Sequence, residues 1–357
     1  MSSTAQDQGQ AQHQQQQQGL KGVVVAASSS AGSVWAGLTE VERTSLLVAF
    51  ARWQGAQQHV WPDGTPWYTD PLGEHFVRHC IPVEEQQRIL DWQEQRAKIC
   101  RFVAVRTAEL DAQISIALRS SGSSNAAAAG GSVGSEQGIR QILLLGSGTD
   151  TRAWRLPWPP GFKVFEVDSP AVLAFKARVL SAAAAAATAA GDEQQQQQQQ
   201  QQAAGHPQLQ CEQRVEVAAD ASQPEEMWAS LVSSGLDAAQ PVLWLLEGFI
   251  GYLTVPASNA LLAHLAIKSA PGSRILITAP PTPDRLGEAA AIDNAGAAAA
   301  AAESPKLQLH HSTFEEPTET LSRLAAAGWR DCQLLDEQQL VAKYGVEHAQ
   351  PILVGSL

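Results

Sequence analysis

Apolar residues follow two different periods along this chain. Over residues 38–57 they recur at near-helical spacing, and the same spacing returns over residues 83–118. From residue 141 onward the pattern changes to short apolar runs, separated by stretches with helical spacing. The first part of the chain therefore predicts helices, and the second part predicts strands that alternate with helices.

The short apolar runs in the second part predict strands, and the first of them predicts a strand that is buried on both faces. The run QILLL at 141–145, stopped by Gly146, is typical of parallel strands covered by helices on both sides. Pro170 can open a helix, because proline is tolerated in a first helical turn. The alternation predicts a doubly wound, mostly parallel α/β sheet with an N-terminal helical extension. The further strands are expected at residues 164–167, 214–217, 241–246, 274–278 and 329–335, and helices at 170–179, 257–269 and 318–327.

The change of pattern along the chain predicts three parts, and low-complexity tracts of glutamine and alanine interrupt them. We expect a disordered Gln/Ser-rich head over residues 1–37, a helical cap over 38–135 and a Rossmann-like core over 136–357. The tracts near 182–205 and 285–305 are interpreted as surface insertions or helix extensions within the core. Loops accept such insertions because the entropy cost of closing a loop grows only slowly with its length.

Charge and cysteine content exclude several classes of protein. Lys and Arg number 24 against 36 Asp and Glu, for a net charge of −12, so we expect no nucleic-acid partner. No apolar run approaches the roughly 18 residues that cross a bilayer, and no apolar secretory segment follows Met1. The four cysteines are far apart and form no CxxC pair. We therefore expect a protein of the cytoplasm without a membrane partner, with import into an organelle left open.

Candidate ligand-binding residues follow the first two predicted strands. Gly146 and Gly148 come directly after the first strand, where the lack of a Cβ lets backbone N–H groups approach a ligand. Asp168 follows the second strand and can accept hydrogen bonds from both hydroxyls of a ribose, or can cap the helix at Pro170. Thr151 stands where a dinucleotide-binding loop has its third glycine, which weakens a pyrophosphate interpretation.

Three further charged residues are candidates, each with a structural alternative. Asp220 follows the third strand and can accept from an exocyclic amine or belong to an ordinary loop. Glu247 ends a very apolar strand, where a carboxylate is costly unless it binds a ligand or forms an ion pair. Arg106, on the helix before the sheet, can clamp a carboxylate bidentately or be solvated.

The motifs around these residues resemble those of the leucine carboxyl methyltransferase superfamily, including its bacterial S-adenosylmethionine-dependent members. The most specific are LLGSGTDTR at 144–152 and FEVDSP at 165–170. Asp70-Pro71, Arg106-Thr107 and the WLLEG segment at 244–248 are similar as well. The resemblance spans about residues 38 to 345 and is interrupted by the tracts.

This resemblance implies a Rossmann-like fold that binds S-adenosyl-L-methionine. Ala221 departs from the leucine usual in the family, and the smaller side chain removes apolar contact with the adenine ring. Arg52 is a looser match to a basic residue of the N-terminal helix. By resemblance, the cofactor-binding residues are Arg106 for the methionine carboxylate, Gly146 and Gly148 for the loop, Asp168 for the ribose, Asp220 and Ala221 for the adenine, and Glu247 for the methionyl end.

The resemblance implies O-methylation of a carboxylate or hydroxyl on a small molecule. Carboxyl methylation of a protein C-terminal leucine, as for type 2A phosphatases, is an alternative, as are an NAD-dependent oxidoreductase and a catalytically inactive binding module. The sequence indicates no catalytic base. His75 and His79 are four residues apart but lack a third ligand, so no metal site is expected. The oligomeric state is left open.

Overall fold

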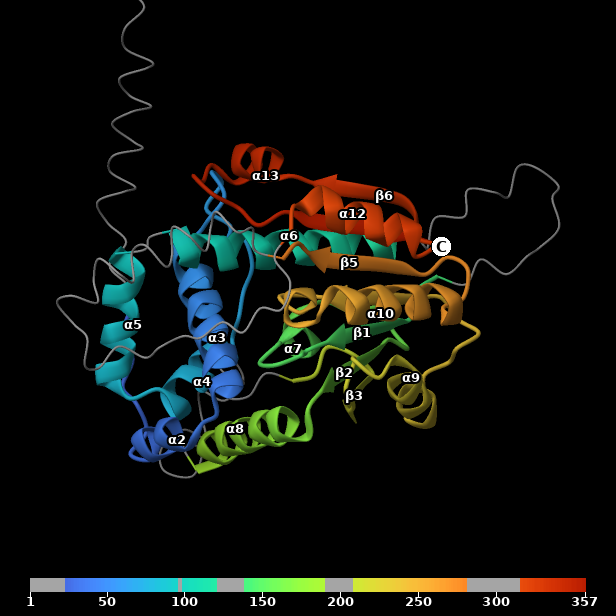
Figure 1. Ribbon diagram of the computed structural model, residues 1–357. Helices are drawn as coiled ribbons and strands as arrows, with labels where there is room; N and C mark the ends of the chain where they lie inside the picture. The colour runs from blue at the N-terminus through green and yellow to red at the C-terminus, as the bar shows by residue number, and fades with distance from the viewer. Residues whose placement is uncertain (1–22, 96–97, 121–137, 190–207, 281–314) are drawn as a thin grey trace, which may run out of the picture.

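Seven strands form one sheet in the part of the chain that the computed structural model describes, which is residues 23–95, 98–120, 138–189, 208–280 and 315–357 (Figure 1). The strand order is β3-β2-β1-β4-β5-β7-β6, and only β7 runs antiparallel to its neighbours. The predicted α/β class with a mostly parallel sheet is confirmed. The strands are β1 (Gln141–Leu145), β2 (Lys163–Asp168), β3 (Gln213–Ala218), β4 (Val242–Leu246), β5 (Arg274–Thr278), β6 (Arg330–Leu335) and β7 (Ile352–Ser356).

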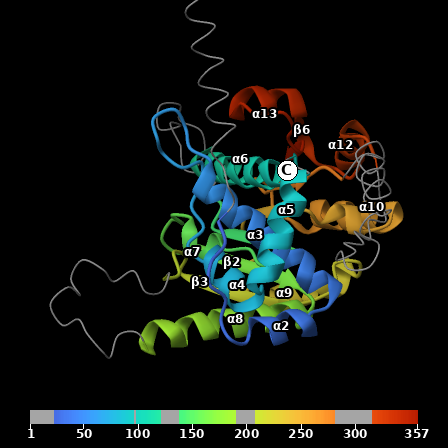
Figure 2. The ribbon, with the colours of Figure 1, turned by 90° about the vertical axis from the view of Figure 1, so that its left-hand side faces the viewer.

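Helices cover both faces of this sheet, and the N-terminal helices gather beside the carboxyl ends of its strands (Figures 1 and 2). The N-terminal helices are α2 (Ala31–Gly37), α3 (Glu40–Gln58), α4 (Gly73–Cys80), α5 (Val83–Gln95) and α6 (Lys98–Ser120). Those that follow are α7 (Arg152–Arg155), α8 (Pro170–Ala189), α9 (Pro224–Ser233), α10 (Val255–Lys268), α12 (Pro317–Ala326) and α13 (Glu337–Tyr344), with a 3₁₀ turn η2 (Ile250–Tyr252).

The two-residue period of the strands separates two apolar clusters. Leu143 and Trp244 point to one face, where they pack with side chains of α9, α10 and α12. Leu144 and Leu243 point to the other face, where they pack with α3, α4, α6 and α8. The N-terminal helices thus share an apolar core with the sheet, so they are part of its covering layer as well as a cap.

Two buried glutamines bind an extended segment at the start of the described chain. Gln54 on α3 accepts from the N–H of Val23 at 3.0 Å and donates to the same residue's carbonyl. Gln86 on α5 accepts from the N–H of Val25 at 2.9 Å and donates to its carbonyl at 3.1 Å. Each side-chain amide therefore pairs with both the N–H and the carbonyl of one residue, as a residue of a neighbouring antiparallel strand would. The head was expected to be disordered to residue 37, but residues 23–37 are bound here and include helix α2.

The sequence pattern placed most elements but missed several. The helix expected over residues 83–118 is two helices, α5 and α6. Helices α2, α4, α7, α9 and α13 and strand β7 were not predicted. Helix α8 extends into the alanine tract as far as residue 189, whereas the glutamine tract and the alanine tract after β5 lie outside the described residues. None of the described helices is both long and apolar enough to span a bilayer.

Replacing Gln86 with leucine should loosen the extended segment. The substitution leaves the N–H and carbonyl of Val25, and the carbonyl of Ile81, without their partner. We expect a loss of about 2 kcal/mol in unfolding free energy and faster proteolysis near residues 23–30. Gln87→Leu is the matched control, because Gln87 is exposed and its side-chain amide hydrogen-bonds only to Asp91 in the described structure. Equal proteolysis of the two variants would contradict the assignment.

Candidate functional site

The candidate residues gather at the carboxyl edge of the sheet, where strand order reverses. β1 lies between β2 and β4, so the chain winds outward in both directions from β1. The loops after β1, β2 and β4 meet at this switch point, the usual ligand site of open α/β sheets. Gly146, Gly148, Asp168 and Glu247 lie in or beside these loops.

The loop after β1 requires glycine for reasons internal to the protein. Gly146 has a φ of 67°, and a Cβ there would lie 2.5 Å from the ring of Phe249. Gly148 has a φ of 43°, and its Cβ would lie 2.7 Å from Oγ of Ser45 on α3. Backbone N–H groups of the loop bond within the protein, since that of Gly146 donates to the carbonyl of Val167 at 2.9 Å. The glycines thus let the loop pack tightly between the post-β4 segment and the cap.

Asp168 ties the end of β2 to this loop. Its Oδ2 accepts from the N–H of Gly148 at 2.8 Å, and its Oδ1 accepts from the N–H of Ser169 at 2.8 Å. Burial raises the pKa of Asp168, although these two bonds oppose the shift. Ser169 Oγ accepts from the N–H of Val172 in the first turn of α8, so the cap is Ser169 and not Asp168. Each Asp168 oxygen keeps a second lone pair for a ligand.

Asp220 and Ala221 lie beyond β3, the edge strand beside β2. Oδ1 of Asp220 accepts from the N–H of Ser222 at 2.8 Å, which forms an Asx turn. Ala221 is buried in the cluster that contains Val167 of β2. These two residues therefore lie on the β2 side of the switch point, whereas Glu247 lies on its β4 side.

The structure brings Arg106 and Glu247 together. Nε of Arg106 donates to Oε1 of Glu247 at 2.8 Å, and both side chains are largely buried. Nη1 of Arg106 also lies 3.4 Å from Oε1 of Gln350. Gly248, with a φ of 60°, lies against the guanidinium, where a Cβ would be in ordinary contact with Nη1 of Arg106 at 3.5 Å. The ion pair was one of the alternatives that the sequence left open for Glu247.

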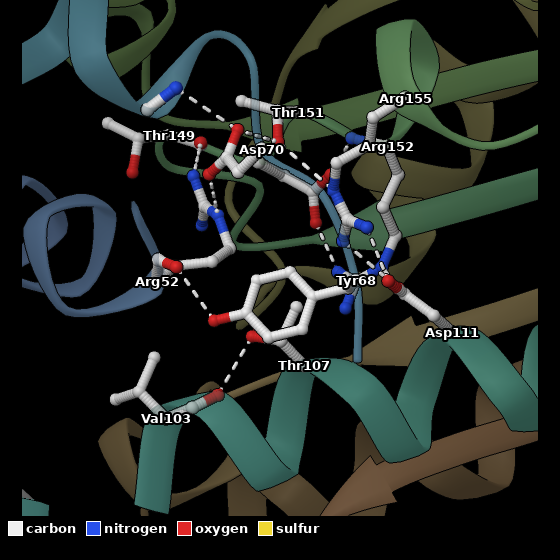
Figure 3. A network of polar contacts seen from close by, with 12 residues as sticks. Arg52, Tyr68, Asp70, Val103, Thr107, Asp111, Thr149, Thr151, Arg152 and Arg155 are labelled. Carbon is white, nitrogen blue, oxygen red and sulfur yellow. Dashed lines mark hydrogen bonds and ion pairs between the residues drawn. The ribbon is translucent and has the colours of Figure 1, made fainter. Parts of the chain in front are cut away.

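The other oxygen of Glu247 binds an arginine that sequence analysis did not single out. Nη1 of Arg152 donates to Oε2 of Glu247 at 2.6 Å. Nε of Arg152 donates to Oδ1 of Asp111 at 2.8 Å, and its Nη1 also pairs with Asp150. Figure 3 shows Arg152 and Arg155 converging on Asp111 of α6. The only sequence signal was a charged Asp-Thr-Arg step directly after a glycine loop.

A second ion pair attaches helix α3 to the same loop. Nε of Arg52 binds Oδ2 of Asp70 at 2.6 Å, and its Nη2 donates to the carbonyl of Thr149 at 2.7 Å (Figure 3). Oδ1 of Asp70 accepts from the hydroxyl of Thr151 at 2.9 Å. Tyr68 donates its hydroxyl to the carbonyl of Arg52 at 2.7 Å. The loosely matched Arg52 therefore contacts the glycine loop, but through the loop's backbone.

Opposite charges decide the protonation state of the buried carboxylates. Burial favours the neutral form of Glu247, but attraction by Arg152 and Arg106 outweighs it and holds the pKa at about 2. The pKa of Asp150 is also held low, because Arg152, Lys176 and Arg155 outweigh the effect of burial. Both groups are therefore ionised at neutral pH. Within the described residues, no cluster of His, Cys, Asp and Glu could hold a metal ion.

The sequence of the chain matches the family model for leucine carboxyl methyltransferase over residues 46–266. The chain belongs to the leucine carboxyl methyltransferase family. The match runs from within α3 to within α10, and so it includes the loops and arginines described above. The predicted family resemblance is confirmed.

Individual relatives support the same family assignment. A protein of Mycobacteroides abscessus, provisionally named an S-adenosyl-L-methionine-dependent methyltransferase, is 30% identical over 332 residues, or 90% of this chain and 89% of that protein. A relative from Mycolicibacterium smegmatis with the same provisional name is 32% identical over 251 residues, or 68% of each chain. One from Parafrankia sp. is 39% identical over 143 residues, which span only 38% of that protein.

Replacing Gly146 with alanine should destabilise this leucine carboxyl methyltransferase family member more than the same change at Gly64. Both glycines have positive φ, so both variants incur the roughly 1–2 kcal/mol cost of that backbone for an L-residue. Only the Cβ at 146 meets a neighbour, the ring of Phe249, and overpacking adds about 1–3 kcal/mol. Chemical unfolding of both variants measures the difference. Adding Phe249→Ala to Gly146→Ala should relieve the overpacking, and no relief would contradict the contact.

Acidification should weaken the fold through Glu247. Its pKa is about 2 in the folded protein against an ordinary 4.5, so the carboxylate contributes stability above pH ~4.5 that is lost as the pH falls towards 2. Glu247→Gln should be less stable than the wild type at pH 6, and the gap should narrow at pH 3. Glu74→Gln, which removes an exposed pair with Arg78, should show little difference at either pH. A gap that is constant with pH would argue against this ion pair.

Proposed function

We propose that the chain binds S-adenosyl-L-methionine and transfers its methyl group to an oxygen of a small-molecule carboxylate or hydroxyl. The observation that carries the proposal is the buried Arg106–Glu247 pair, which lies at the sheet's switch point beside the glycine loop and Asp168. Membership of a methyltransferase family and the provisional names of the relatives support the same activity.

The residues at the switch point fit the methionyl end of this cofactor. That end carries one carboxylate and one ammonium group. Within the described chain, Nη2 of Arg106 has no hydrogen-bond partner, so the guanidinium keeps a donor for the carboxylate. Each oxygen of Glu247 accepts one hydrogen bond and retains a lone pair for the ammonium group.

The residues on the β2 side fit the adenosine end. Asp168 ends β2 with free lone pairs on both oxygens and would accept from the ribose hydroxyls. In the described structure the Asp220 carboxylate accepts a hydrogen bond through Oδ1, from the N–H of Ser222, so Oδ2 is left for the exocyclic amine of adenine. Ala221 offers little apolar surface, so we expect adenine to contribute less to affinity than the ribose does.

For methyl transfer, the main task of the protein is to align the acceptor with the methyl group of the cofactor. When bound, the cofactor supplies a methyl group made electrophilic by the sulfonium. Holding two reactants in line and excluding water can lower a barrier by up to roughly 7–11 kcal/mol in ideal cases. Arg106, Arg152, Glu247 and Asp150 are engaged in ion pairs and are not placed to accept a proton. A carboxylate acceptor fits this arrangement, because it is already a nucleophile and needs no base.

The alternative activities are distinguished by their acceptors and cofactors. Carboxyl methylation of a protein C-terminal leucine uses the same chemistry and differs only in the size of the acceptor. An NAD-dependent oxidoreductase would place a pyrophosphate at a helix N-terminus, whereas this loop leads into the four-residue α7 and carries the anionic Asp150. The remaining alternative is an inactive binding module. We propose a small acceptor and a cytoplasmic location, with no nucleic-acid or membrane partner.

Replacing Asp168 should weaken binding of S-adenosylhomocysteine more than replacing Asp220. Asp168→Asn affects two ribose contacts, and the loss of charged hydrogen bonds costs about 1.5–3 kcal/mol each. Asp220→Asn affects one amine contact. Titration calorimetry on the two variants and the wild type measures both losses, and near-UV circular dichroism checks that each variant is folded. Equal or reversed losses would refute the two assignments.

A labelling experiment tests the activity itself. The protein is incubated with methyl-labelled S-adenosylmethionine and a cell extract separated into small molecules and proteins. Alkali releases methanol from a methyl ester but not from a methyl ether, so alkali-labile label in the small-molecule fraction would indicate a carboxylate acceptor. Label on a protein C-terminus would support the phosphatase-like alternative. Cofactor binding without labelling of any fraction would point to an inactive module.

A further inference from the structure

We propose that Arg152 is a positioning residue that fixes the carboxylate of Glu247 for the methionyl ammonium group of the cofactor. The inference rests on the proposed function, because it assigns a role within the same site. It also predicts which part of the cofactor the arginine affects.

Two arginines on different elements hold the two oxygens of Glu247. Arg106 reaches Oε1 from helix α6 at 2.8 Å, and Arg152 reaches Oε2 from helix α7 at 2.6 Å. With Arg106 alone, the carboxylate could turn about its terminal bond and still keep one hydrogen bond. With both arginines in place, the plane of the carboxylate is set, and so are the directions of its remaining lone pairs.

Arg152 is itself held rigidly enough to serve this purpose. Its Nε binds Asp111 at 2.8 Å, its Nη1 also pairs with Asp150, and the residue is only 1% exposed. The indole N–H of Trp158 donates to its backbone carbonyl at 2.9 Å. A guanidinium offers several donors in a fixed plane, so one side chain can contact three carboxylates at once. The ammonium of a lysine cannot reproduce this geometry.

Arg155 provides a matched control on the same short helix. Its side chain is as buried as that of Arg152, at 2% exposure, and it binds the same Asp111. In the described structure it does not contact Glu247; its other hydrogen bond goes to Oγ1 of Thr151 at 3.2 Å. A substitution at Arg155 therefore disturbs the shared ion pair and leaves Glu247 held by both arginines.

The test compares two probes, S-adenosylhomocysteine and 5′-methylthioadenosine, by titration calorimetry. Both contain adenosine and a thioether, but only the first carries the amino-acid end. In Arg152→Lys, affinity for S-adenosylhomocysteine should fall about tenfold or more, the effect of losing one charged hydrogen bond. Affinity for 5′-methylthioadenosine should change less than about twofold. In Arg155→Lys, the affinities for the two probes should keep their wild-type ratio.

A second variant keeps the proposal testable if Arg152→Lys fails to fold. The double substitution Arg152→Gln with Asp150→Asn removes one cation and one anion together, so it leaves no unpaired charge from the Arg152–Asp150 contact. It should show the same selective loss of S-adenosylhomocysteine, whereas Asp150→Asn alone should show a smaller loss. Equal weakening of both probes in the Arg152 variants, or no weakening of either, would overturn the positioning role. A wild-type protein that binds neither probe would instead refute the proposed function.

Discussion

Buried carboxylates at the carboxyl edge of the sheet require cations, and this requirement links the parts of the molecule. Asp70, Asp111, Asp150 and Glu247 are paired with four arginines, which come from α3, α6 and α7. An unpaired charge at this depth would cost several kcal/mol. The cap helices therefore supply partners without which the loops after β1 and β4 could not keep their charges. The apolar cluster that α3, α4 and α6 share with β1 and β4 also joins the N-terminal helices to one face of the sheet.

Six of the seven described strands were predictable because each of them carries its signal locally. The runs before Gly146 and Glu247 are apolar on both faces, and the run before Asp168 is apolar except for Glu166; each ends at a polar residue or a glycine, so the pattern marks its limit. Strand β7 has no such signal, since it contains a glycine and is recognised by its antiparallel pairing with β5 and β6. The extended segment near residue 23 was missed for a similar reason: it is held by glutamines more than thirty residues away.

Several residues of the candidate site were singled out from the sequence, but Arg152 and the contacts among the residues were not. Glu247 stood out because a carboxylate at the end of a buried strand needs a partner, and Arg106 stood out as a cation near the sheet. In the fold Glu247 pairs with Arg106, and its other oxygen pairs with Arg152, which lies 95 residues earlier in the sequence. Both contacts depend on how α6 and α7 pack, which no local pattern in the sequence shows. The glycines were expected to open the loop to a ligand, whereas here they also admit Phe249 and Ser45.

The balance of charges suggests how such a site discriminates between ligands. Four arginines face four carboxylates, so the network is neutral overall, and the amino-acid group of the methionyl end, with one carboxylate and one ammonium, is neutral too. The network and this amino-acid group therefore attract each other only weakly at long range, because opposite contributions cancel; the sulfonium next to it keeps its own positive charge. In the proposed mode of binding, recognition of the amino-acid group depends on orientation at short range, where the fixed guanidinium of Arg106 meets a carboxylate and the fixed carboxylate of Glu247 meets an ammonium group. A site of this kind has to be rigid, and the repeated use of arginine with buried acids provides that rigidity.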